Sequence, residues 1–142
     1  MDGKLRWFES VTEVDLLKAR CVEKEDVSGV LAELASMPSL RSMVLPASCA
    51  VRAVDAAAMC AITTLTTLRF VKVFDVDGFP MEVGEWVLDF SRLPTLTSLH
   101  LEECAAVTDK QVQELSSLTG LTSLYVDDCR NVTIDGLLAV IK

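Results

Sequence analysis

Two pairs of carboxylates, Glu102-Glu103 and Asp127-Asp128, are the residues of this chain best placed to bind a charged partner. They stand at the same place in two similar segments, LTSLHLEECAAVT and LTSLYVDDCRNVT, which begin 25 residues apart. If the segments lie side by side, the four acids gather on one surface that suits a Lys- or Arg-bearing segment of another protein. Like charges directly opposite each other destabilise strand pairing. Because these acids oppose pairing, we favour a role for them in binding. A solvated acidic rim is the alternative, and a divalent-cation site is a third, although no ligand-loop spacing supports it.

His100 and Tyr125 precede the two acidic pairs at equivalent positions. Tyr125 is the expected aromatic anchor for a partner, whereas His100 is either a contact residue or an ordinary exposed histidine. A catalytic histidine would need a nucleophile and an orienting group within hydrogen-bond reach. Ser98 and Ser123 fall on the same side, but no glycine turn that could form an oxyanion hole accompanies them. Glycine-rich phosphate loops and metal-like clusters are also missing, so we expect no enzyme activity, no cofactor and no metal.

The two segments share an apolar skeleton, Lxx-L-x-L followed by a cysteine and a valine, and earlier copies precede them. Leu40 and Leu65 begin clear copies of its first half, and Val11 begins a weaker one. Five units therefore start at 11, 40, 65, 96 and 121, with spacings of 29, 25, 31 and 25 residues. Repeats of about 20–50 residues are typical of stacked architectures, in which each unit needs its neighbours to cover its apolar face.

Each unit has the pattern of a strand followed by a helix. In the fourth unit, Leu99 and Leu101 alternate with polar residues, as a half-buried strand requires. An apolar series at helical spacing follows, from Val112 to Leu118. Thr108 or Asp109 can cap the start of this helix, and Gly120 can end it in a left-handed conformation.

The third unit is longer than the others. Its extra residues carry turn signals at positions 77–80, Asp-Gly-Phe-Pro, which predict an outward loop. We expect Trp86, Val87 and Phe90 to return from this loop to the core.

The motif LxxLxLxxC followed by a valine and a threonine resembles the cysteine-containing class of leucine-rich repeats. The units at 96 and 121 carry the whole motif, whereas Ser48 and Val73 stand at the cysteine position of the units at 40 and 65. The resemblance implies an α/β solenoid, a right-handed β-α superhelix of about five repeats with parallel strands on the concave face and helices on the convex face. It also implies a single domain over residues 1–142, with residues 1–10 as an N-terminal cap, and a non-enzymatic module that binds proteins through its concave strands. No F-box precedes Val11, so an adaptor role is not implied.

Stacking in register predicts rows of outward side chains. One row reads Asp15, Val44, Arg69, His100 and Tyr125; the next reads Leu17, Pro46, Val71, Glu102 and Asp127; the third reads Lys18, Ala47, Lys72, Glu103 and Asp128. Such a face is apolar at its second strand, basic at its third and acidic at the last two. The predicted partner-binding residues are Arg69, Lys72, His100, Glu102, Glu103, Tyr125, Asp127 and Asp128.

Composition limits the classes of partner. With 142 residues the chain has the length of one domain, and its net charge of -8 and pI near 4.6 argue against binding to nucleic acid or to an anionic membrane surface. Neither a signal peptide nor a stretch of about 20 apolar residues is visible. We therefore expect an intracellular, cytoplasmic scaffold whose partner is a protein. A basic segment of that partner is compatible with the acidic charge of this chain.

The cysteine pattern favours thiols over disulfides. Five cysteines occur, none at the spacing of a metal site. Cys104 and Cys129 occupy equivalent positions, where we expect buried structural thiols in a reducing compartment. A disulfide between these two neighbours is the geometric alternative.

The two ends of the array differ. Trp7 and Phe8 are expected to pack over the first unit as a cap. After Asp135-Gly136, the apolar run Leu137, Leu138, Val140 and Ile141 begins a helix with no polar cap behind it. This end indicates a piece of a longer solenoid, a small self-contained array, or a subunit that dimerises or assembles end to end.

Overall fold

The computed structural model describes residues 9–17, 27–72 and 85–141, and every structural statement below concerns these residues. Several predicted features lie outside them. They are the cap residues Trp7 and Phe8, the outward residue Lys18, the cysteine Cys21, and the insertion at 73–84.

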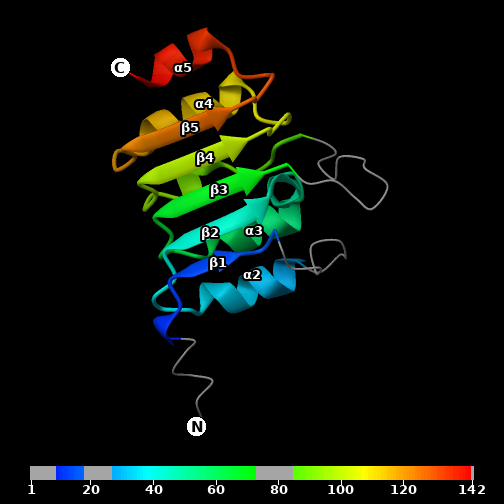
Figure 1. Ribbon diagram of the computed structural model, residues 1–142, viewed down its shortest axis with the longest axis vertical. Helices are drawn as coiled ribbons and strands as arrows, with labels where there is room; N and C mark the ends of the chain where they lie inside the picture. The colour runs from blue at the N-terminus through cyan, green and yellow to red at the C-terminus, as the bar shows by residue number, and fades with distance from the viewer. Residues whose placement is uncertain (1–8, 18–26, 73–84, 142) are drawn as a thin grey trace.

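Five parallel strands form one sheet, in the order in which they occur in the chain (Figure 1). Their bounds are β1 Glu13–Asp15, β2 Ser42–Pro46, β3 Thr67–Val71, β4 Ser98–Glu102 and β5 Ser123–Asp127. The expectation of an α/β fold with a parallel sheet is confirmed.

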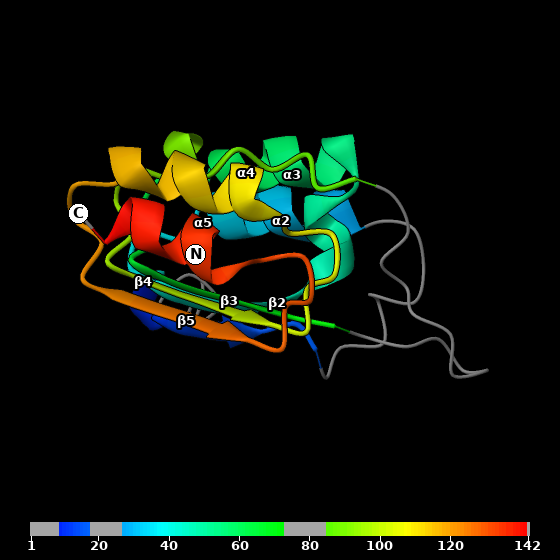
Figure 2. The same ribbon diagram turned by 90° about the horizontal axis from the view of Figure 1, so that it is seen from above.

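Helices cover one face of this sheet (Figure 2). The α-helices are α2 Val27–Ala35, α3 Ala53–Cys60, α4 Asp109–Glu114 and α5 Ile134–Val140. Short 3-10 helices add η2 Ala47–Ala50, η3 Phe90–Arg92 and η4 Leu115–Ser117. Between β3 and β4 the described residues contain only the single turn η3, so the strand-helix pattern is not uniform along the chain.

The pairing register matches the predicted rows. Parallel partners run from Asp15 through Val44, Arg69 and His100 to Tyr125. A second row runs from Pro46 through Val71 and Glu102 to Asp127; Leu17, predicted to begin it, lies beyond the paired residues of β1. Because successive side chains point to opposite faces of a strand, the residues between these rows enter the core.

The core fills the layer between the sheet and the helices. On β4, Leu99 and Leu101 are fully buried, as the alternating pattern predicts. Phe70 of β3 meets Trp86 edge-on at a centroid distance of 5.0 Å, and Trp86 contacts Phe90 at 5.6 Å. Trp86 and Phe90 thus return to the core as expected, but Val87 does not: it is 49% exposed, because the extended backbone between them turns alternate side chains outward.

Helix α4 starts as predicted but ends differently. The Thr108 side chain accepts from the N–H of Lys110, and Gln111 Oε1 accepts from the Thr108 N–H at 2.8 Å. The α-helix stops at Glu114 and tightens into η4. There, backbone bonds such as Leu118 N to Leu115 O satisfy the last carbonyls, so Gly120 does not need the predicted left-handed conformation and does not adopt it.

Candidate functional site

The candidate site is the sheet face opposite the helices, which we call the open face. It is defined by the outward side chains Arg69, His100, Glu102, Tyr125 and Asp127, together with Lys72, Glu103 and Asp128 at the ends of their strands. Each predicted binding residue is therefore brought onto strands β3, β4 and β5 or the residues that directly follow them. The apolar residues Val44 and Val71 continue the same rows toward β2.

An ion pair joins the third and fourth strands. The Arg69 guanidinium donates through Nη2 to Glu102 Oε2, and both side chains are partly exposed. In the sheet, Arg69 lies directly opposite His100, so the pair runs diagonally to the residue two positions further along β4. Arg69 Nε is buried and has no hydrogen-bond partner among the described residues, so one N–H donor of the guanidinium group is not used there.

The same diagonal relationship recurs between the fourth and fifth strands. His100 Nε2 lies 2.6 Å from Asp127 Oδ2, and the His100 ring lies 5.4 Å from the Tyr125 ring at an interplanar angle of 35°. A carboxylate oxygen only accepts, so a proton on Nε2 completes this hydrogen bond. The bond directs His100 toward Asp127 rather than toward a serine.

The four carboxylates are close in register but not alike in environment. Glu102 and Asp127 are direct partners across β4 and β5, and each has a nitrogen donor on the preceding strand. Glu103 and Asp128 are exposed, and no side-chain hydrogen bond or ion pair is recorded for either within the described residues. The unneutralised negative charge of the open face therefore lies at the strand ends.

Glu103 and Asp128 also share an unusual backbone. Their φ angles are 53° and 51°, in the left-handed region that side chains other than glycine rarely adopt. Each residue directly follows its strand, and the Glu103 N–H donates to the Asp127 carbonyl at 2.8 Å. Sequence reasoning missed this bend because neither position carries a glycine; the only signal was an acidic residue at the same place in two units.

Beneath the open face, the two equivalent cysteines link neighbouring units. Cys104 Sγ donates to the Phe70 carbonyl at 3.7 Å, and Cys129 Sγ donates to the Leu101 carbonyl at 3.5 Å. Both are buried, and both are thiols rather than a disulfide, which confirms the predicted structural role. Each sulfur also lies near the carbonyl two residues earlier, Cys104 Sγ at 3.5 Å from Glu102 O and Cys129 Sγ at 3.6 Å from Asp127 O, so a weak donor faces the carbonyls on either side of each acidic bend.

A further joint, not foreseen from the sequence, fixes the fifth unit on the fourth. The Asp109 carboxylate accepts from the Thr133 backbone N–H at 2.7 Å and from the Thr133 hydroxyl at 2.6 Å. These hydrogen bonds, the side-chain one first, lower the pKa of Asp109. Asn131 Nδ2 donates to the Ala105 carbonyl at 2.6 Å beside it. Gly136 is required here, because a β-carbon at this position would lie 2.1 Å from Asp109 Oδ1.

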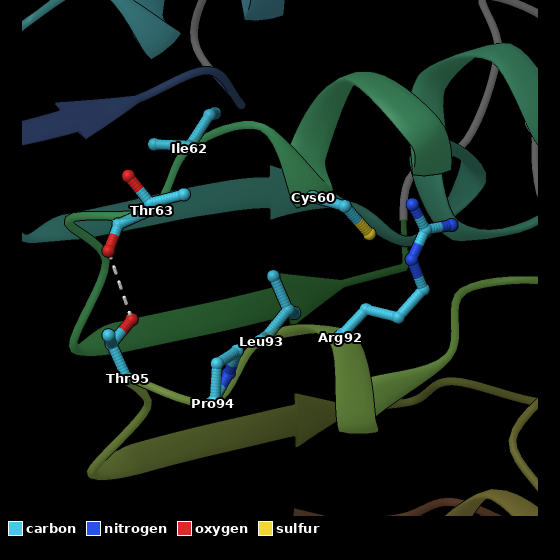
Figure 3. Close-up of a pocket in the computed structure, with 7 residues that line it drawn as sticks. All are labelled: Cys60, Ile62, Thr63, Arg92, Leu93, Pro94 and Thr95. Atoms are coloured by element: carbon cyan, nitrogen blue, oxygen red, sulfur yellow. Dashed lines mark hydrogen bonds between the residues drawn. The ribbon is translucent and has the colours of Figure 1, made fainter.

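One small pocket lies away from the open face (Figure 3). It has a volume of about 50 Å³ and is lined by Cys60, Ile62, Thr63, Arg92, Leu93, Pro94 and Thr95. Ligand pockets usually span about 300–1,000 Å³, so this one is far too small for an organic ligand. Burial raises the pKa of the Cys60 thiol, which disfavours the reactive thiolate. The open face remains the better candidate.

Within residues 9–17, 27–72 and 85–141, no group of three His, Cys, Asp or Glu side chains is arranged to hold a metal ion. None of the helices described there has the length and apolar character needed to cross a membrane.

Comparison with known proteins gave no match: no protein-family model, no curated protein and no solved structure is significantly similar to this chain.

Proposed function

We propose that this chain is a non-enzymatic protein-interaction module of the leucine-rich-repeat solenoid type, whose open face is the concave binding surface. The observation that carries the proposal is the register of β1 to β5. It aligns a constant apolar skeleton on the inner face and a changing set of side chains on the outer one. A scaffold that keeps its core and varies one surface is suited to recognition.

The chemistry of the open face points to a partner protein with a basic, extended segment. Glu103 and Asp128 supply negative charge without an internal partner, which would steer a Lys- or Arg-rich segment toward the strand ends. Tyr125, at 55% exposure, offers a large flat anchor beside that charge. Arg69 and His100 hold Glu102 and Asp127 in fixed positions, so that these carboxylates can orient a partner's donors rather than attract it from a distance. Lys72, half-buried after β3, forms the basic border of the surface.

A peptide-display selection tests this proposal. Lys/Arg-containing peptides should be enriched over acidic and scrambled ones on the wild-type chain. The double variant Glu103→Lys/Asp128→Lys should lose that enrichment, because it reverses the charge while leaving both internal pairs intact. Glu33→Lys, on the exposed surface of α2, is the matched control and should bind like the wild type. Equal selection by the double variant and the control would remove the strand-end carboxylates from the proposal.

A second candidate is a structural subunit of a larger assembly, which the exposed apolar side chains of α5 favour. For either role we propose a reducing compartment such as the cytoplasm. The thiols at Cys49, Cys60, Cys104 and Cys129 support this choice.

A further inference from the structure

Strands β4 and β5, which lie side by side (Figure 1), repeat the same chemistry at three levels of the open face. Their outward side chains are direct partners in the register, hydroxyl beside hydroxyl, ring beside ring and carboxylate beside carboxylate. We call these six side chains the graded strip: Ser98 and Ser123, His100 and Tyr125, Glu102 and Asp127. On β3 the same three levels hold Thr67, Arg69 and Val71, so the strip is confined to β4 and β5.

The hydroxyls at the start of the graded strip are not used to join one unit to the next. Thr97 and Thr122, one residue earlier, each donate a hydroxyl hydrogen bond at 3.2 Å to a backbone carbonyl of the preceding unit. Ser98 and Ser123 are half-buried, and their hydroxyls make no hydrogen bond to any of the described residues. Because a hydroxyl both donates and accepts, this level suits a small polar side chain of a partner.

The rings in the middle of the graded strip form an ordered platform. The Tyr125 ring is exposed and lies 5.4 Å from the His100 ring, which its hydrogen bond to Asp127 holds in place. Aromatic side chains pack well on such rings in offset or edge-on arrangements. A cation could also lie over Tyr125, but it gains more beside the carboxylates of the next level. An aromatic side chain is therefore the residue that fits here.

The carboxylates at the end of the graded strip keep acceptors for a partner. Arg69 binds Glu102 through Oε2, and His100 binds Asp127 through Oδ2. The other oxygens, Oε1 of Glu102 and Oδ1 of Asp127, accept no hydrogen bond within the described part of the chain. The exposed carboxylates at the strand ends add negative charge directly after this level. Lys or Arg is the residue that fits here.

The spacing of the three levels selects the direction of a bound segment. Levels two residues apart on a strand are about 6.6 Å apart, and an extended peptide turns alternate side chains to one side at the same interval. Neighbouring strands are only about 4.8 Å apart, so a peptide that crosses the strands soon loses step with their side chains. Extended layers that pack face to face also keep their directions within about 30° of each other. A segment that runs along β4 and β5 therefore matches the graded strip.

We propose that an extended segment of the partner protein lies along β4 and β5 and presents three side chains to the graded strip, at positions i, i+2 and i+4. A small polar residue meets the hydroxyls, an aromatic residue meets the rings, and Lys or Arg meets the carboxylates. The direction of the segment sets which end is basic, but it does not alter the spacing. This inference rests on the proposed function, to which it adds the sequence pattern of the partner.

Titration of the ¹⁵N-labelled chain with short synthetic peptides, followed by nuclear magnetic resonance, tests the pattern. The capped peptide Gly-Asn-Ala-Phe-Ala-Lys-Gly and its reverse carry the pattern in the two directions. Gly-Asn-Phe-Ala-Ala-Lys-Gly has the same composition, but its aromatic residue is displaced by one position and turns to the other side of an extended chain. We expect at least one patterned peptide to bind at least about fivefold more tightly than the displaced one.

A variant of the platform tests the contact at the middle level. Tyr125→Ala should weaken binding of the patterned peptide at least about fivefold. It should not change binding of the same peptide with alanine in place of phenylalanine, because the lost contact is the one between the two rings. Tyr125 is 55% exposed, so its removal should leave the fold intact. Val44→Ala, in the same row but on β2, is the control and should bind like the wild type.

The outcomes separate this inference from the proposed function. Equal binding of the patterned and displaced peptides would overturn the inference, as would an effect of Tyr125→Ala that does not depend on the phenylalanine. Failure of both patterned peptides to bind, while Lys/Arg-containing peptides from the selection do bind, would also overturn the inference alone. If none of these peptides binds, the proposed function is contradicted as well.

Discussion

Asp127 on β5 is bound by His100 on β4, with 2.6 Å between Oδ2 and Nε2. The two residues are not direct neighbours in the register: His100 lies opposite Tyr125, and Asp127 is two positions further along. Arg69 and Glu102 repeat this offset one strand earlier. The open face is thus organised by a diagonal contact between consecutive strands. This contact orients the carboxylates of Glu102 and Asp127.

A double-mutant cycle on His100 and Asp127 should detect this contact. Asp127 is well exposed, so we expect a coupling free energy of only about 0.3–1 kcal/mol between His100→Ala and Asp127→Ala. The coupling should shrink in concentrated salt. Chemical denaturation of the wild type, the two single variants and the double variant measures this coupling free energy. As a control, the pair Glu33→Ala and Asp127→Ala, on opposite sides of the molecule, should give no coupling. A zero value for His100 and Asp127 would mean that the contact does not order the face.

The left-handed backbone at Glu103 predicts opposite effects for two substitutions. Glu103→Gly should leave the free energy of unfolding unchanged or raise it, because glycine adopts a φ of 53° without steric cost. Glu103→Val should lower it by roughly 1–2 kcal/mol, since a β-branched residue is strained there. Urea denaturation compares them. Equal stability of the Gly and Val variants would show that the bend relaxes when the side chain changes.

The joint between Asp109 and Thr133 predicts a dependence of stability on pH. The folded-state pKa of Asp109 lies below the ordinary value of 3.8, so the folded chain binds fewer protons at this site than the unfolded chain does. The stabilisation is fully present above that ordinary value and is lost as the pH falls through the lower folded-state pKa.

Removing the Asp109 carboxylate should therefore lower the stability only at pH values at which this carboxylate is charged. Asp109→Asn should be less stable than the wild type at neutral pH, and the difference should narrow below pH 3.8. Asp135→Asn, in the first turn of α5, is the matched control. Denaturation at a series of pH values gives the comparison, and a difference that stays constant with pH would contradict the assigned cause.

Gly136 should tolerate no larger side chain while Asp109 is present. Gly136→Ala places a β-carbon 2.1 Å from Asp109 Oδ1 and should cost about 1–3 kcal/mol of unfolding free energy through overpacking. Gly120→Ala is the control, because its nearest neighbour would lie 3.7 Å away, at the Leu96 carbonyl. Thermal unfolding distinguishes them. If Gly136→Ala costs the same in an Asp109→Gly background, which also removes the Asp109 β-carbon at 2.9 Å, the steric explanation is wrong.

The parts of the fold predicted best depend on short-range periodicity. The alternation of Leu99 and Leu101 with polar residues, repeated in Leu124 and Val126, was sufficient to predict which residues face one another across five strands. Strand pairing follows such a pattern closely, because a slip by one residue would expose the whole apolar set. The buried position of the thiols followed from the same register.

The features that sequence reasoning missed depend on contacts between units or on backbone geometry. The sequence suggests Asp109 only as one of two candidate caps of its own helix, beside Thr108, yet its carboxylate binds Thr133 of the next unit. The bends at Glu103 and Asp128 were hidden because glycine, the usual marker of a left-handed residue, is absent there. The diagonal pairing of Arg69 with Glu102 depends on the reach of a long side chain, which a row of directly opposed residues does not describe.

Nuclear magnetic resonance mapping of a bound basic peptide tests the central claim most directly. The ¹⁵N-labelled chain would be titrated with a Lys/Arg-containing peptide from the selection, under conditions in which the chain is monomeric. We predict saturable shift changes at Arg69, His100, Glu103, Tyr125 and Asp128, with α2 and α3 unaffected. Shift changes confined to the helices, or none at any peptide concentration, would contradict the assignment of the open face as the binding surface.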